Sequence, residues 1–368
     1  AGSTIAATVT VPITGIATAA VKTAADFESA MSQVAATMGK TQQDVKDMGL
    51  TDLAKQMGAT TAFSATEAAD GINILAMAGL TAQEIGDGLG TVLNLAAAGA
   101  IDMGSAASYV IGAVKGFGDE VANASKYADL MAKGATLANT DVASLGEAIS
   151  YSAATAAGYS QNVDSMTLSL LRMAEQNVTG QTAATSLNRA MADLYTPTAE
   201  AQKALDQLGI SAYNADGSAR DFNAVVDELS ASFKGMSEAE ANALKNTIFT
   251  TNGLNAFNKM TASASERVEE LRAGLEDTGG SAALQAATQL DNLNGQLTLL
   301  KSATEGILIT IGDKLMPFVK DAVSWIQKAA DFINGLSDAQ VENMLKWAGI
   351  AAAIGPGIMV FGKVVSTI

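Results

Sequence analysis

The sequence predicts an all-α protein made of many short helices, and three observations support this prediction. Apolar residues recur at spacings of three and four along most of the chain, as the buried face of a helix requires. Ser or Thr followed three residues later by Glu or Asp, a pattern that can cap a helix N-terminus, precedes several of these stretches. Glycines follow the stretches at intervals of about 15–20 residues, where a left-handed residue can end a helix. We therefore expect a multi-helix array of short capped helices and αα-hairpins.

Residues 61–98 show the pattern most clearly. Ser64-Ala-Thr-Glu67 can form a capping box, and Gly79 can take the left-handed conformation that ends the helix. Leu80 would then close a Schellman turn, and it also stands directly before a second capping box, Thr81-Ala-Gln-Glu84. Because one leucine serves the end of one helix and the start of the next, we expect a tight αα-hairpin here.

Composition excludes several kinds of chemistry. The chain has 368 residues with no Cys and no His, so it can form neither a disulfide framework nor a His- or Cys-based zinc site. Ser-His-Asp and Cys-His nucleophile arrangements are excluded for the same reason. The net charge is −16, whereas nucleic-acid binders need a basic footprint, so we expect no specific nucleic-acid binding. Aromatic residues make up only 5%, and a fold rich in Ala and Gly must gain its stability from many shallow helix contacts.

Several separated stretches of the chain resemble the core region of phage tail tape measure proteins. They include the Thr-Val-Pro-Ile run of residues 10–13, Phe27-Glu28 with Met31, and Asn139-Thr-Asp141. Within the central hairpin the resemblance is carried by Thr61-Ala-Phe63-Ser64-Ala-Thr-Glu67-Ala-Ala69, Ala76-Met-Ala-Gly79 and Leu93-Asn-Leu-Ala96. The resemblance extends from about Val9 to the C-terminus, over nearly the whole chain.

The resemblance implies a non-enzymatic structural protein of the virion, lying in the tail lumen near the tail tip. Such proteins are assembled in the host cytoplasm, set tail length and leave ahead of the DNA at infection, and many help to cross the host envelope. The implied partners are other copies of the chain, as a trimer or another low-order ring, the tail tube, tail-tip or distal tail proteins, and tail assembly chaperones. A host membrane is a further implied partner on ejection. No cofactor, metal site or catalytic residue is predicted.

The chain divides into four parts by pattern. An uncharged N-terminal leader segment, 1–21, precedes a helical core domain at 22–278. A small β-hairpin is expected near 210–221, where Asp216-Gly217 is a turn signal. Asn214-x-Asp216-Gly217 also resembles part of a calcium loop, but the later ligands are absent and we favour the turn. Gly279-Gly280 is the clearest hinge in the chain and precedes the two remaining parts.

The third part, 281–316, is expected to be a long amphipathic helix with a heptad-like seam. Two interpretations of this seam stand side by side: a coiled coil between copies of the chain, or a helix packed on its own domain. Gly295, Gly306 and Gly312 disfavour a free-standing coil, since each costs up to about 1 kcal/mol relative to Ala. We expect Pro317 to kink or end the helix. The seam consists of seven residues, Leu290, Leu293, Leu297, Leu300, Thr304, Ile307 and Ile311.

The fourth part, 317–368, is expected to form apolar C-terminal helices. Its uncharged stretch, 347–362, is shorter than the roughly 18–20 residues of a membrane span, and Pro356 would break it. Either this end is buried against neighbouring chains in the assembled tail, or it enters the host membrane after ejection. The residues that would pack or insert are Trp347, Ile350, Ile354, Ile358, Met359 and Phe361.

Two other functions compete with the structural one. The small-residue C-terminus with its Gly-Pro-Gly motif would also suit a membrane-active helical protein unrelated to tails. A tail-associated peptidoglycan hydrolase could use a pair of carboxylates, although no pair stands out in the sequence. Activity on purified peptidoglycan separates the hydrolase from the other two.

Overall fold

A computed structural model describes residues 2–334, with side chains described for residues 16–328. The described part is all-α, as predicted, and contains 17 α-helices and no strand. The helices are α1 (Gly2–Met38), α2 (Gln42–Asp47), α3 (Leu50–Thr60), α4 (Ala65–Met77), α5 (Ala82–Gly99), α6 (Met103–Phe117), α7 (Ala124–Leu137), α8 (Val142–Gly158), α9 (Val163–Ala174), α10 (Gly180–Tyr195), α11 (Ala199–Leu208), α12 (Phe222–Ser232), α13 (Glu238–Ile248), α14 (Thr251–Met260), α15 (Ser265–Glu276), α16 (Ser281–Leu290) and α17 (Leu293–Asn334). A short 3-10 helix, Val121–Asn123, precedes α7.

The chain forms two compact units. The larger comprises residues 25–309, and the smaller combines residues 1–24 with residues 310–368. Helices α1 and α17 contribute residues to both units. The uncharged segment 1–21 lies within α1 wherever it is described.

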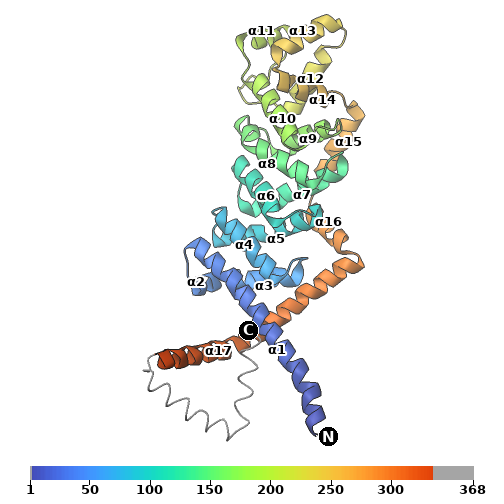
Figure 1. Ribbon diagram of the computed structural model, residues 1–368. Helices are drawn as coiled ribbons and strands as arrows, with labels where there is room; N and C mark the ends of the chain where they lie inside the picture. The colour runs from blue at the N-terminus through green and yellow to red at the C-terminus, as the bar shows by residue number, and fades with distance from the viewer. Residues whose placement is uncertain (1, 335–368) are drawn as a thin grey trace. The chain divides into compact units, whose positions relative to one another are not determined.

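In the larger unit, successive helices stack on one another in chain order (Figure 1). Helix α6 packs on α8, α8 on α10, and α10 on α14. The chain then reverses: α15 packs against α7 and α9, and α16 packs against α5 and α7. The segment that follows α14 therefore returns along one side of the array and holds helices from different parts of the sequence together.

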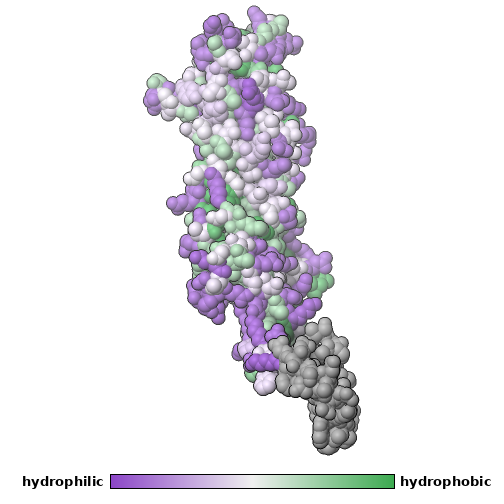
Figure 2. All heavy atoms as spheres, turned by 60° about the vertical axis from the view of Figure 1, so that its left-hand side comes forward, coloured by the Kyte–Doolittle hydropathy of each residue, from purple (hydrophilic) through white to green (hydrophobic). Residues whose placement is uncertain are grey.

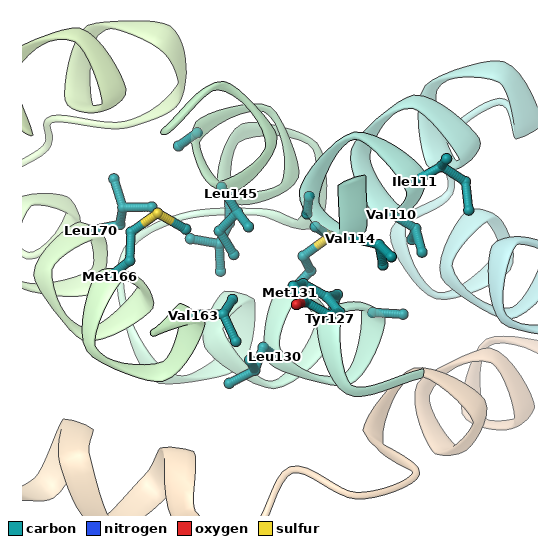
Figure 3. Packing of buried hydrophobic residues seen from close by; sticks show 14 of the residues in the cluster. Val110, Ile111, Val114, Tyr127, Leu130, Met131, Leu145, Val163, Met166 and Leu170 are labelled. Atoms are coloured by element: carbon teal, nitrogen blue, oxygen red, sulfur yellow. The ribbon is translucent and has the colours of Figure 1, made fainter. Parts of the chain in front are cut away.

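The core of the larger unit is one continuous apolar cluster between the helices. Figure 3 shows its middle section, where side chains from α6, α7, α8 and α9 converge on a shared interior. Small residues allow close helix contacts around it: a Cβ added at Gly116 of α6 would lie 2.5 Å from Ala153 Cβ of α8. On the face drawn in Figure 2, hydrophilic side chains are widespread, with hydrophobic ones in smaller groups between them.

The observed N-terminal caps agree with the sequence pattern at most helix starts. Both bonds of the capping box are present at Ser64 and Thr81, as predicted. They are present as well at Thr41 and Ser237, where the same pattern of Ser or Thr followed by Asp or Glu occurs. The predicted Schellman turn is also present, since Gly79 has a φ of 80° and the Leu80 N–H donates to the Leu75 carbonyl. The αα-hairpin at 61–98 is therefore confirmed.

Three local predictions differ from the structure. The stretch Ser263-Ala-Ser-Glu266 predicts a capping box from its sequence, but the box is absent because α15 begins at Ser265 with Ala264 as its N-cap. Thr196-Pro197 predicts a helix with Pro at its first position, but Thr198 caps α11 and places the start two residues after Pro197. The long helix expected from Ser281 is divided at residues 291–292, and its second part, α17, then continues through Pro317 without ending there.

Residues 210–221 form a turn with very little β-structure. Gly217 has a φ of 84°, as the Asp-Gly turn requires, and the flanking residues make one isolated antiparallel bridge, Tyr213 to Ala219. Asp216 Oδ1 accepts hydrogen bonds from the Ser218 N–H, at 2.9 Å, and from Ser218 Oγ, at 2.6 Å. The Asp216 carboxylate therefore stabilises the turn, which agrees with the turn interpretation that we favour over a calcium loop.

The described part of the smaller unit contains the beginning of α1 and the second half of α17. The two helices meet where Gly312 of α17 lies against Ala20 and Ala24 of α1. All three residues are buried. A side chain at Gly312 would collide with the Ala20 backbone, so this crossing depends on a glycine.

Candidate functional site

The predicted seam lies on α17, which starts at a sharp corner after α16. The Asn292 side chain begins the helix, accepting a hydrogen bond from the Gly295 N–H at 3.0 Å. Gly295 is closely approached by the backbone of Leu290, so the corner leaves no room for a side chain at position 295. This corner turns the chain from α16 into the first half of α17, residues 293–309, which belongs to the larger unit.

Five of the seven predicted seam residues point into solvent along this part of α17. The exposed fractions are 72% for Leu293, 53% for Leu297, 62% for Leu300 and 61% for Ile307, and Thr304 is exposed as well. Leu290 lies in α16 and is partly buried. Ile311 is exposed at 37%, on the part of α17 that belongs to the smaller unit.

The opposite face of the same helix packs on the larger unit. Gly295, Ser302 and Ile309 are buried, and they follow one another at intervals of seven residues. If Leu290 is position a of a heptad, these three occupy position f, which lies opposite the a/d seam. The buried residues of this part of α17 therefore lie opposite the predicted seam, whose side chains are mostly exposed in the single chain.

A carboxylate fixes this orientation. Glu305 Oε1 accepts hydrogen bonds from the Thr66 N–H, at 3.1 Å, and from Thr66 Oγ1, at 2.7 Å. Thr66 lies in the first turn of α4, where the helix dipole favours a negative charge. No sequence pattern signals this pairing, because the two residues are 239 positions apart.

A pocket of about 750 Å³ borders the beginning of α17. Its walls come from the α3–α4 connection, α5, α16 and the first turns of α17, and they are mostly small or neutral side chains. Asp291 is its single carboxylate, so the pocket holds no acid–base pair. Within residues 2–334 no group of three or more His, Cys, Asp or Glu residues is arranged to hold a metal ion.

Many carboxylates are used in capping helices. Glu67, Glu84 and Glu240 complete capping boxes with the backbone N–H of the N-cap residue. The glycines at 86, 88 and 90, whose spacing resembles part of a dinucleotide-binding loop, lie within α5. The network around Asp193 is similar: this buried carboxylate on α10 accepts hydrogen bonds from the N–H and Oγ1 of Thr250, the N-cap of α14.

The second predicted site, Trp347, Ile350, Ile354, Ile358, Met359 and Phe361, lies outside the described residues. Among the helices that the structure describes, none is both long enough and apolar enough to span a bilayer. Phe318 and Trp325, on the second half of α17, are exposed at 71% and 74%, and neither is among the predicted site residues.

Comparisons with known proteins identify the family to which the chain belongs. A family model described as phage-related minor tail protein matches residues 51–250, which is more than half of the chain. The tape measure protein of Pneumococcus phage Dp-1 is 29% identical over 367 residues, covering 100% of this chain and 32% of the relative. The probable tape measure protein of Escherichia phage P2 is 25% identical over 347 residues, covering 90% of this chain and 42% of the relative.

The chain thus spans between about a third and two fifths of the length of these curated relatives. No solved structure matches it. The matched family region, 51–250, coincides with the stacked helices α3 to α13, so the shared sequence corresponds to the helical array itself. On the strength of these matches, the chain belongs to the phage-related minor tail protein family, the tape measure proteins of phage tails.

Proposed function

We propose that this chain is a non-enzymatic, folded segment of a tape measure protein that lies in the tail lumen, near the tail tip. The observation that carries the proposal is the match to a tape measure protein along 100% of the chain. In this proposal the protein assembles in the host cytoplasm with tail assembly chaperones, contacts the tail tube and the tail-tip or distal tail proteins, and sets tail length. It leaves the tail ahead of the DNA and aids passage through the envelope.

The compact fold of this chain supports placing the length-setting role in another part of the gene product. A single helix of 368 residues would extend about 550 Å at 1.5 Å per residue. Residues 25–309 instead fold into a compact array, so they cover far less length per residue. We therefore propose that the length-setting rod lies in other parts of the gene product, whose curated relatives are much longer than this chain.

Electron microscopy of tails made by phages with in-frame deletions tests this function. Deleting the segment that encodes residues 25–309 should prevent the formation of tails of uniform length. Deletions elsewhere in the gene should shorten tails by about 1.5 Å per residue removed. Infectious tails of normal length that lack residues 25–309 would contradict the proposal.

The parts of the chain receive separate roles within the proposal. The helical core domain, 22–278, is the scaffold, and the helix of 281–316 is the segment through which copies associate as a trimer or another low-order ring. The exposure of Leu293, Leu300 and Ile307 supports this role, since a single chain leaves these side chains in water.

The apolar C-terminus, 317–368, either packs against neighbouring chains or enters the host membrane after ejection. Dye-loaded liposomes distinguish the two roles, with the full chain compared to an Ile354→Asp, Phe361→Asp variant. Dye leakage caused by the parent and lost in the variant supports membrane entry. Equal leakage from both chains, or none from either, assigns this end to packing.

A further inference from the structure

The segment that follows Gly279-Gly280 buries very little apolar surface. We call residues 281–309, which comprise α16 and the part of α17 in the larger unit, the strap. Most side chains of the strap are exposed, and a single large apolar side chain is among its buried residues. Because the stability of a packed segment grows with the apolar area that it buries, the strap gains little from this source. The buried residues are Ala282, Ala286, Gly295, Ser302 and Ile309.

Helix α15, directly before the hinge, is attached in a different way. Leu271 and Leu275 are buried in the continuous core. The Arg267 guanidinium also forms an ion pair with Glu175 of α9, at 2.9 Å. The buried side chains thus change from leucines to alanines across Gly279-Gly280, and Gly280 has a φ of 76°. The attachment weakens where the backbone has the most freedom to turn.

The strap is also incompletely packed against α5. The pocket of about 750 Å³ lies along this contact, with Leu93 and Ala97 of α5 among its lining residues and Ala283, Ala286 and Ala287 of α16 among the others. Atoms that line a void lose the dispersion contacts that close packing would give them. The contact between α5 and the strap therefore holds less tightly than a filled helix interface of the same extent.

The remaining attachment of the strap is polar. Asp129 of α7 caps the start of α16, and Gln285 Nε2 donates to the Ala132 carbonyl, also of α7, at 2.8 Å. Glu305 joins α17 to Thr66 of α4. Water can replace each of these partners once the strap leaves, so the net contribution of each bond is small. The bonds fix the position of the strap more than they add to its stability.

We infer that the strap is a detachable segment, which leaves the larger unit as one cooperative piece by turning at Gly279-Gly280 while residues 25–278 stay folded. Proteins open locally in contiguous units whose free energy of opening lies below that of global unfolding, and weakly packed segments open first. Opening would uncover the face of α5 that carries Leu93 and Ala97, together with the Asp129 carboxylate of α7. A molecule that binds this face would compete with the strap and shift the population toward the open state. The inference is independent of the proposed association through the seam.

Thiol labelling of the full chain tests the inference, because the chain contains no Cys of its own. Ala286→Cys places a buried thiol on α16, where the pocket leaves room for the sulfur. Ser302→Cys does the same on α17. Ser152→Cys is the control on α8, since Ser152 Oγ is buried without a hydrogen-bond partner among the described residues and its replacement removes no bond. Circular dichroism checks that all three variants fold.

A buried thiol reacts only when its segment opens, so the labelling rate measures the population of the open state. We expect both strap variants to react with similar rates, at least about 100-fold faster than Ser152→Cys. Their rates should depend weakly on urea, because opening the strap exposes little surface, whereas the Ser152→Cys rate should rise steeply. One common rate and urea dependence for all three variants would show that the strap opens only when the whole unit unfolds, which contradicts the inference. A slow Ser302→Cys beside a fast Ala286→Cys would overturn the single cooperative segment.

Hydrogen exchange of the unmodified chain locates the hinge. The amides of α16 should exchange through the small opening, and those of α15 should exchange with α7 and α9. If the α15 amides open together with those of α16, the hinge does not lie at Gly279-Gly280 and the assignment of the strap is wrong.

Two glutamines on α16 separate release of the strap from fraying of its helix. In the Ala286→Cys background, Gln285→Ala removes the hydrogen bond to Ala132 and should accelerate labelling by about 3- to 10-fold. Gln289→Ala makes the same substitution at an exposed position of the same helix and should change the rate by less than about twofold. Equal effects of the two substitutions would show that labelling reports fraying of α16 and not its release from α7, and would overturn the inference.

Discussion

The carboxylate of Asp129, on α7, accepts hydrogen bonds from the backbone N–H groups of Gly280 and Ala282, each at 2.9 Å. These donors belong to the first turn of α16 and lie more than 150 residues further along the chain. Gly280 has a φ of 76°, so the residue that the sequence marks as a hinge is held in place by a buried acid. Asp129 thus caps α16 from another helix and fixes the point where the chain enters α16.

Asp129→Ala should destabilise the larger unit by about 1–3 kcal/mol, because it leaves N–H groups of α16 without an acceptor. Asp129→Asn, which keeps one side-chain oxygen as an acceptor, should lose less stability. Urea denaturation measures both effects, and hydrogen exchange should show faster exchange of the α16 amides. Asp164→Ala is the matched control, since its ion pair with Lys126 is exposed and should contribute less than about 1 kcal/mol. Equal losses in Asp129→Ala and Asp164→Ala would contradict the capping role.

Arg172 provides a second long-range connection, and its removal should be costly. Its guanidinium is buried and donates to the Met260 carbonyl and to Asn223 Oδ1, each at 3.1 Å, thereby joining α9, α12 and α14. Arg172→Ala should cost about 2–5 kcal/mol, through the lost packing and the acceptors left unpaired. Asp227→Asn should cost much less, because this ion-pair partner is almost half exposed. The chemical denaturation midpoints of the two variants test whether Arg172→Ala loses more stability than Asp227→Asn.

Substitution by alanine should change the stability of the fold in opposite directions at two glycines in neighbouring helices. Gly86 lies inside α5 with no atom within 4 Å of an added Cβ, so Gly86→Ala should stabilise the fold by about 0.5–1 kcal/mol. Gly116→Ala should destabilise it by about 1–3 kcal/mol, since the added Cβ meets Ala153 of α8. Thermal unfolding of both variants measures the difference, and a stabilising Gly116→Ala would show that the α6–α8 contact can relax.

The sequence predicted local features well because they are decided within a few residues. The capping boxes at Ser64 and Thr81 and the left-handed Gly79 each involve groups within one turn of one another. The expected box at Ser263 failed because a cap also depends on the path by which the chain enters the helix.

The long-range contacts could not be predicted in this way. The caps from Asp129 to α16 and from Glu305 to α4 pair residues that only the tertiary fold brings together. The candidate seam could be predicted from spacing alone. The spacing did not show which face of α17 packs on the larger unit, because that depends on the position of Glu305 against Thr66.

The capping box of α5 should make a measurable contribution to the pH dependence of stability. Hydrogen bonds from the Thr81 N–H and from its hydroxyl hold the pKa of Glu84 below its ordinary value. A lowered pKa in the folded state means that the stabilisation is present above the unfolded pKa of about 4.3 and is lost as the pH falls through the folded value. Glu84→Gln keeps an acceptor but cannot titrate, so the stability difference between parent and variant should shrink between about pH 5 and pH 3. A difference that stays constant over this range would show that the Glu84 charge does not act through the cap.

The last prediction concerns the seam, where two introduced charges should prevent copies from associating without affecting the folding of each chain. Leu293 and Leu300 are exposed in the single chain, so a double variant, Leu293→Asp with Leu300→Asp, should fold normally and keep its helix content. In an assembled ring the same carboxylates would be buried without partners, which is strongly unfavourable, so the variant should remain a monomer of 37.4 kDa. The control is Asn294→Asp with Thr298→Asp, which adds the same charge at exposed positions of the same helix that are not seam residues. Light scattering coupled to size exclusion measures the masses. If the seam variant and the control assemble as the parent does, copies do not associate through this face of α17.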